Sequence, residues 1–284
     1  MAPLDPAREW LATQIRSRVI GDRPHERAAA IVGGEGPRWF AEDRPIRIVH
    51  ADAAMFVGGL RALLLQSLHP LAMAGVAVHS GYRADPWGRL QRTAEFLAAT
   101  TYGTAEVAER AVRRVRGVHA RVTGTAEDGR AYSANDPHLL AWVHVAEVDS
   151  FLAAHQRYGV RPLDATEADG YVADAAVIAA RLGMIDPPTT VAELRRALAG
   201  YRPELRGTPA ARDAARFLLL KPPLPLAARP AYAALGAAAV ALLPAWARWP
   251  LRLPFLPVSE TVLVRPAGEL ITRLIRWSLQ SAAA

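Results

Sequence analysis

The chain has 284 residues, of which 51% are hydrophobic, and it carries a formal net charge of +7. It contains no cysteine, which excludes disulfides, thiolate-ligated haem, iron–sulfur clusters and cysteine-rich zinc sites. Its cations are arginines apart from Lys221 and lie dispersed among alanines without aromatic platforms, so the charge does not indicate a protein that binds nucleic acid.

Apolar residues recur at helical spacing along the chain, and strand signals are scarce. Asp85 and Asp136 each precede a proline, and Thr104 follows a glycine, so these three residues are predicted helix N-caps. A short turn or hairpin is predicted over residues 124–132, with Asp128-Gly129 at its tightest point. The predicted helices cover residues 5–20, 50–69, 86–101, 104–123, 135–157, 166–181, 190–199, 208–220, 228–247 and 259–280.

Proline-rich breaks at residues 186–189 and 221–225 are too short and too apolar to be domain linkers. A single helical core is ordinary for a chain of this length. We therefore predict one all-α domain over residues 1–284, in which the helices of residues 205–284 pack on the core.

No apolar run of signal-peptide type begins the chain, so a cytoplasmic location is expected. Residues 231–247 are almost uncharged, but Pro244 interrupts them and they fall short of the roughly 20 apolar residues of a membrane span. Buried helices are predicted there. A peripheral membrane contact through residues 224–256 stays open, because Trp246 and Trp249 lie among arginines.

The predicted helix 86–101 carries a group of residues suited to an anion. Arg89 and Thr93 are four residues apart and share a helix face, and Arg92 flanks them. A guanidinium beside a hydroxyl suits a buried anion such as a haem propionate.

The predicted helix 104–123 carries His119 on its apolar side. Val112, Val115, His119 and Val122 recur at helical spacing, which points the imidazole inward. A neutral imidazole in an apolar wall is what an axial ligand of haem iron requires. The alternative is a core histidine that bonds a backbone carbonyl.

Five ordered blocks of this sequence are residues 58–70, Gly-Val-Ala-Val-His-Ser (75–80), Asp-Pro-Trp-Gly-Arg-Leu-Gln-Arg-Thr (85–93), the His119 helix and residues 132–144. Together they resemble a family of bacterial and fungal proteins related to latex-clearing protein and the oxygenase MpaB. The similarity spans roughly residues 30 to 155, and a weaker likeness in hydrophobic pattern continues to the end of the chain.

The resemblance implies a globin-like helical core around haem b and an oxygenase that uses O2 on an apolar small molecule. His119 matches the proximal haem ligand of the latex-clearing branch, and Arg89 and Thr93 match its haem-side arginine and threonine. Arg92 stands where that branch has a lysine. An arginine keeps its proton at neutral pH, so it could close a distal site but not exchange protons there.

The chain also departs from the rubber-cleaving enzymes. They use a distal carboxylate upstream of the helical turn that here carries Arg89, Arg92 and Thr93, which we call the Arg89 turn. No Asp or Glu lies between Asp52 and Asp85, so polyisoprene cleavage is not expected. His69 and His79 lie in this stretch as candidate distal residues. The alternatives are a helix-end histidine before Pro70 and a loop histidine, respectively.

Other functions stay open beside a haem b oxygenase. The chain could be a haem sensor or carrier with His69 or His79 as a second ligand, or a haem-free helical protein that binds lipid or acts as a scaffold. A zinc or di-iron site is weakly supported, because His138 and His144 are six residues apart and do not share a helix face. The apolar C-terminal third could serve as a homodimer interface or as core.

Overall fold

The computed structural model describes residues 5–21 and 24–279. This part of the chain is mostly helical, as the sequence predicts, and its strands form one antiparallel hairpin. The hairpin pairs β1 (Thr123–Thr125) with β2 (Ala131–Ser133), which confirms the reversal predicted over residues 124–132. Gly129 has a φ of 84° in its turn, a conformation that disfavours any residue with a side chain.

The helices cover most of the remaining chain. In chain order they are α1 (Asp5–Val19), α2 (Pro24–Val32), α3 (Pro45–Ala51), α4 (Met55–Gln66), α5 (Pro70–His79), α6 (Pro86–Tyr102), α7 (Ala105–His119), α8 (Pro137–Tyr158), α9 (Ala165–Leu182), α10 (Val191–Tyr201), α11 (Pro209–Leu220), α12 (Arg229–Leu242), α13 (Ala245–Leu251), α14 (Pro257–Ser259) and α15 (Arg265–Leu279). Short 3₁₀ turns lie at η1 (Arg202–Glu204) and η2 (Leu226–Ala228), and a π-helical turn lies at η3 (Glu260–Val264).

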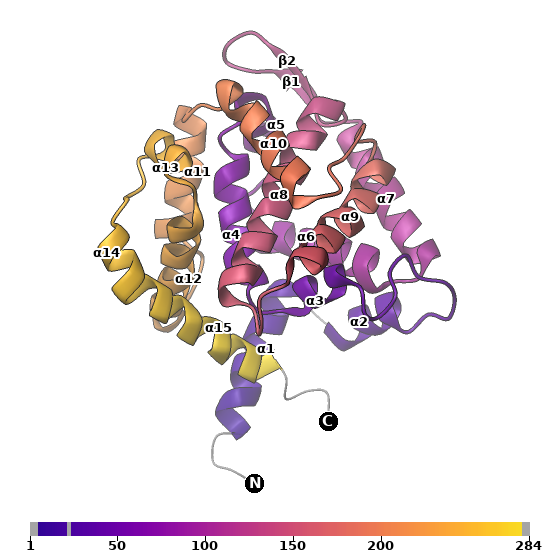
Figure 1. Ribbon diagram of the computed structural model, residues 1–284, viewed down its shortest axis with the longest axis vertical. Helices are drawn as coiled ribbons and strands as arrows, with labels where there is room; N and C mark the ends of the chain where they lie inside the picture. Colours follow the sequence, from indigo (N-terminus) through magenta and orange to yellow (C-terminus); the bar gives the residue numbers. More distant parts are fainter. Residues whose placement is uncertain (1–4, 22–23, 280–284) are drawn as a thin grey trace.

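The long helix α8 runs through the middle of the molecule, with α11 to α15 on one side and α6, α7 and α9 on the other (Figure 1). Helix α4 packs along α8, and Gly58 permits the close approach, since a Cβ there would lie 2.8 Å from Phe151 Cδ1. Buried Arg61 ties α4 to α8 and α12 by donating to Asp149 Oδ2 (2.7 Å), Ser150 Oγ (2.6 Å) and Leu242 O (3.0 Å).

The single helix predicted over residues 50–69 is wrong, because the structure has α3 and α4, bent by 94° between them. Asp52 leaves the helical conformation, and its Oδ1 accepts a hydrogen bond from Ala54 N (2.7 Å) in place of a helical backbone bond. The sequence also does not predict α2 or α5, the latter of which begins at Pro70.

The helix predicted over residues 228–247 is divided as well. Pro244 is the N-cap residue of α13, and α12 ends two residues before it, as a proline inside a helical pattern dictates. Helix α12 buries Leu235, Ala238 and Ala239 against the core, whereas Trp249 on α13 is 87% exposed.

Three predicted caps are confirmed. Asp85 accepts from Gly88 N (2.8 Å), Asp136 from His138 N (2.9 Å) and Thr104 from Val107 N (3.4 Å). These caps start α6, α8 and α7, the helices that carry most of the candidate residues. Among the described helices, none is long and apolar enough by itself to cross a membrane, and only the bent pair α3 and α4 meets that test in combination.

Candidate functional site

A cavity of about 170 Å³ lies between α3, α6, α7, α8 and α9, and we call it the histidine cavity. Its polar wall consists of His50, His119, His144, Glu147 and Tyr171. The rest of the wall is hydrophobic and consists of Ile46, Phe96, Leu97, Val115, Leu140, Val143, Val148, Ala175, Ile178, Ala179, Leu182 and Met184.

His119 is the last residue of α7 and faces the cavity one turn beyond Val115. The predicted inward orientation of its imidazole is therefore confirmed. Its Nδ1 is buried and has no hydrogen-bond partner among the described residues, where no backbone carbonyl bonds the ring as the alternative interpretation requires. Burial lowers the pKa of His119, which leaves the ring neutral at physiological pH.

Two further imidazoles line the same cavity. His144 on α8 has a buried Nε2 without a partner, and burial lowers its pKa to about 4. His50 on α3 shares a hydrogen bond between its Nδ1 and Thr101 Oγ1 (2.8 Å), and burial lowers its pKa to about 3. All three rings are neutral at pH 7 and have nitrogen lone pairs to offer a ligand.

Glu147 places a carboxyl group among these rings. It lies one helical turn after His144 on α8 and makes no hydrogen bond or ion pair with any described residue. Burial raises the pKa of Glu147 to about 7. Tyr171 on α9 is near it, its hydroxyl has no partner, and burial together with the Glu147 charge raises the pKa of that hydroxyl well above 10.

This concentration of unpaired polar groups is costly to the folded protein. A buried donor or acceptor without a partner costs about 1–3 kcal/mol. His119 Nδ1, His144 Nε2 and the Tyr171 hydroxyl are three such groups around one small cavity. Local violations of this kind are typical of sites that bind a ligand, since the ligand supplies the missing partners.

The Arg89 turn lies beside the cavity and not in its wall. Arg89 Nη1 donates to Ser80 Oγ (3.0 Å), and within the described residues Arg89 has no acidic partner. Thr93 is exposed and donates to Arg89 O (3.1 Å). Phe96 and Leu97, which do line the cavity, follow at positions i+7 and i+8 from Arg89, so the Arg89 and Thr93 face of α6 continues into the cavity wall.

The other predicted residues lie further from this wall. Arg92 is exposed and pairs with Asp85 (3.3 Å). His79 is exposed, with its Nε2 3.2 Å from Tyr132 Oη, and His69 is buried beside Glu204. Neither histidine lines the histidine cavity, so their proposed distal roles have no geometric support and stay predictions.

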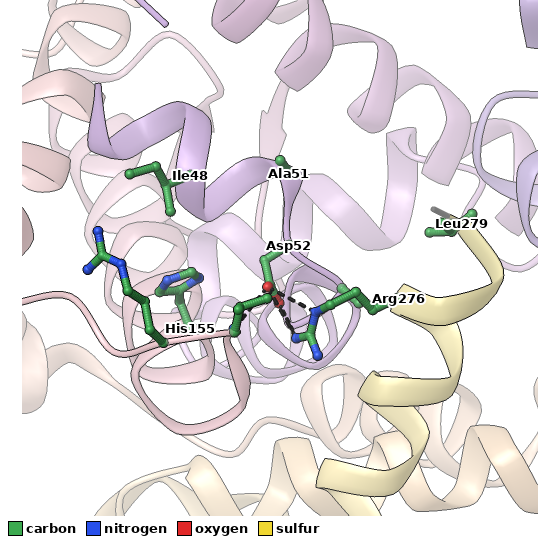
Figure 2. Close-up of a pocket in the computed structure, with 9 residues that line it drawn as sticks. Ile48, Ala51, Asp52, His155, Arg276 and Leu279 are labelled. Carbon is green, nitrogen blue, oxygen red and sulfur yellow. Dashed lines mark hydrogen bonds and ion pairs between the residues drawn. The ribbon is translucent and has the colours of Figure 1, made fainter. Parts of the chain in front are cut away.

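A second hollow of about 500 Å³ lies where α3 ends, beside α8 and α15 (Figure 2). Its main charged pair is Asp52 with Arg276, whose Nη2 donates to both carboxylate oxygens at 2.8 and 3.1 Å. Asp52 also accepts from Ala54 N and Val160 N. These groups satisfy one another. His155 also lines the hollow, and neither of its buried ring nitrogens has a partner among the described residues, so the larger hollow offers a ligand one unpaired imidazole, whereas the histidine cavity offers two and a tyrosine hydroxyl.

Sequence reasoning missed His50, His144 and Glu147 as members of the site. One signal was available for two of them, because the spacing His144-x-x-Glu147 puts both side chains on one face of α8. Spacing within one helix cannot indicate the other neighbours of His144, because they reach the cavity from α3, α7 and α9.

A family model described as "ER-bound oxygenase mpaB/B'/Rubber oxygenase, catalytic domain" matches residues 47–277. No curated protein and no solved structure matches the chain. The matched span contains every polar residue of the histidine cavity as well as the Arg89 turn.

Proposed function

We propose that this chain, which belongs to the family of ER-bound oxygenase MpaB/B′ and rubber oxygenase catalytic domains, uses O2 to oxidise an apolar small molecule at a haem b held in the histidine cavity. The observation that carries the proposal is a pair of neutral imidazoles, His119 and His144, whose buried nitrogens have no partner in the protein. The family supports an oxidoreductase. The haem, its ligand and the substrate class are the proposal.

The residues fit a haem by their chemistry. An unpaired imidazole in an apolar wall suits axial ligation of iron, and a guanidinium without an acidic partner suits a propionate. The cavity is smaller than the roughly 300–1,000 Å³ of ordinary cofactor and ligand sites, at about 170 Å³. A haem, which needs a site larger than this cavity, would therefore also occupy the adjoining face of α6, which carries Thr93 and Arg89.

In this assignment His119 would hold the iron through its neutral ring, and Arg89 would bind a propionate. When bound, haem supplies an iron centre that activates O2, which amino-acid side chains do not provide. The hydrophobic wall keeps water out and orients an apolar substrate by contact alone. A polar substrate would find few partners there besides the unpaired groups of His119, His144 and Tyr171 and the carboxyl group of Glu147.

Glu147 is the group that would hold or accept a proton in this site. Because its pKa is raised to about 7, the carboxyl group exists in both forms near neutral pH, as acid–base chemistry requires. The stretch between Asp52 and Asp85 contains no acid, but α8 brings a carboxyl group into the cavity from elsewhere in the chain.

His144 supports a second candidate function, that of a haem sensor or carrier. A second unpaired imidazole in the same cavity would be available to hold the iron together with His119, and it would then compete with O2. The optical spectrum separates the two functions, since a five-coordinate ferric haem and a bis-histidine haem differ in spin state.

The test is the absorption spectrum of purified protein reconstituted with haem b. We expect a Soret band in the wild type that is lost or strongly weakened in His119→Ala and unchanged in His79→Ala, a matched control that removes an exposed imidazole. A wild-type protein that binds no haem, or a His119→Ala variant with the wild-type spectrum, contradicts the proposal. A low-spin wild type that becomes high-spin in His144→Ala favours the sensor or carrier.

A further inference from the structure

We propose that His69, His138 and Glu204 form a binding site for one divalent first-row transition-metal ion such as Zn²⁺. The three residues come from segments far apart in the chain and meet where α5 and α10 approach the start of α8 (Figure 1). None of them lines the histidine cavity, so this site is separate from the proposed haem site.

The distances suit a single ion. Glu204 Oε2 lies 2.9 Å from His138 Nε2 and 3.3 Å from His69 Nε2, and the three ligand atoms all lie within 4.8 Å of one another. Ligand atoms about 2.0–2.2 Å from one metal ion lie about 3–3.5 Å from each other at tetrahedral or octahedral angles. Side chains at these separations need only small rotations to bind one ion.

His138 Nε2 lies 3.0 and 2.9 Å from the two oxygens of Glu204, so a ring proton on Nε2 lies between the imidazole and the carboxylate when no ion is present. A metal ion would replace that proton, because the ring nitrogen and the carboxylate oxygen each then offer it a lone pair. Tyr201 Oη donates its hydrogen to His138 O (2.8 Å) and lies 3.4 Å from His138 Nδ1, where it can accept the ring proton once Nε2 binds the ion.

His69 can adopt the same tautomer. Its Nδ1 lies 3.5 Å from Ala72 N, beyond the ordinary range of about 2.7–3.2 Å, so moving the ring proton to Nδ1 sacrifices only a weak contact. Burial lowers the pKa of His69 more strongly than the hydrogen bond and charge of Glu204 raise it. The ring is therefore neutral at physiological pH, as a metal ligand must be.

The surrounding structure holds the three side chains in place. His69 is the N-cap residue of α5 and has an extended backbone, because Pro70 follows it at the first helical position. The Asp136 cap fixes the first turn of α8, which carries His138. The Tyr201 ring packs 4.8 Å from that of His138, and the Trp142 ring packs 6.2 Å from that of His69. The site is therefore organised before an ion arrives.

The charge balance permits a cation. Burial raises the pKa of Glu204, but the hydrogen bonds and charges of His138 and His69 outweigh it and hold the pKa below its usual value, so the carboxylate is ionised. The nearby Arg130 is neutralised by Asp128, to which its Nη2 donates at 2.7 Å. Two imidazoles and one carboxylate favour zinc, iron or cobalt over magnesium or calcium, which prefer oxygen ligands, and they leave coordination positions open to water.

The experiment uses the full chain without a histidine tag and without haem, titrated with Zn²⁺ by calorimetry and with Co²⁺ by visible absorption. His138→Ala and Glu204→Gln remove ligands whose side chains are 53% and 39% exposed, so both variants should retain the fold, checked by circular dichroism. His79→Ala and His119→Ala are controls that remove imidazoles outside the site.

We expect one ion per wild-type chain, a Kd raised at least about tenfold in each ligand variant, and an unchanged Kd in both controls. A wild type that binds neither ion overturns the proposal. So does a Kd that is the same in His138→Ala and Glu204→Gln as in the wild type, or an ion that is lost in His119→Ala. The haem spectrum plays no part in this test, so the two proposals fail independently.

Discussion

At the scale of single residues, Glu147 is a carboxyl group in the wall of the histidine cavity that makes no hydrogen bond or ion pair with any described residue. Its pKa of about 7 in the folded protein lies above the unfolded value of 4.5, so the folded state binds more protons than the unfolded state between these two pH values. The contribution of Glu147 to stability therefore falls as pH rises from 4.5 to 7 and is constant above that range.

Glu147→Gln should stabilise the haem-free protein at pH 8 by about 3 kcal/mol and have little effect on stability at pH 4, because glutamine never ionises. The measurement is urea unfolding of variant and wild type across this pH range. The difference between the two curves isolates Glu147 from all other titrating groups. A difference that does not change with pH contradicts the unpaired carboxylate.

The pKa of His144 is shifted in the opposite direction, so its effect on stability has the opposite dependence on pH. Its pKa is lowered from 6.5 to about 4, so the unfolded state binds more protons than the folded state between these values. The stability associated with the neutral ring is complete above pH 6.5 and is lost as pH falls toward 4.

His144→Leu should therefore remove about 3 kcal/mol of acid sensitivity between pH 6.5 and 4, measured by the same unfolding experiment. His79→Leu, which removes an exposed imidazole outside the cavity, is the matched control. An equal acid sensitivity in His144→Leu and the wild type would show that the ring is solvated or paired.

At the scale of elements, the close packing of α4 on α8 involves Gly58 but not the adjacent Gly59. A Cβ at Gly58 would meet Phe151 Cδ1 at 2.8 Å and Phe151 Cα at 3.1 Å, whereas a Cβ at Gly59 would meet nothing within 4 Å. Alanine substitutions at these two adjacent residues therefore measure the cost of overpacking and the gain in helix propensity separately.

Gly58→Ala should destabilise the protein by about 1–3 kcal/mol through overpacking, although alanine is the better helix former. Gly59→Ala, the control, should stabilise it by up to about 1 kcal/mol. Thermal or urea unfolding of the two variants measures both. Stabilisation by Gly58→Ala would mean that α4 can move away from α8 freely.

At the scale of the whole molecule, exposed apolar side chains gather on the C-terminal third, on the flank of Figure 1 that carries α13 and α14. The largest exposed fraction belongs to Trp249, and exposed Arg252 lies three residues further on. The exposed apolar residues of this third are Leu220, Leu226, Trp249, Phe255, Leu256, Val258, Val262, Leu263, Leu270, Leu274 and Trp277. Aromatic and aliphatic side chains beside a cation suit the surface of an anionic membrane.

We expect the protein to cosediment with vesicles that contain phosphatidylserine and Trp249→Ala to weaken that binding several-fold. Trp10→Ala is the control, because Trp10 is 63% exposed and lies on α1, outside residues 224–256. Binding that is equal in the two variants contradicts a membrane contact through residues 224–256. A dimer in solution that Trp249→Ala dissociates would instead make this surface a homodimer interface.

Much of the fold follows from the sequence because its signals are local. Helical apolar spacing, the Asp85, Thr104 and Asp136 caps and the Asp128-Gly129 turn each act within a few residues, and the structure confirms all of them. The sequence patterns do not predict that helices end at Asp52 and before Pro244. Asp52 in particular ends α3 with bonds to Val160 and Arg276, which are over a hundred residues away.

The sequence by itself determined the all-α class, the family and the inward direction of His119, since a helix face and an ordered set of motifs are both written along the chain. Only the tertiary structure decided which side chains share a site with His119. His144 and Glu147 reach the histidine cavity from α8, while His69 meets His138 and Glu204 instead. These meetings depend on how helices pack across the core, and helix packing angles leave no mark at any one position of the sequence.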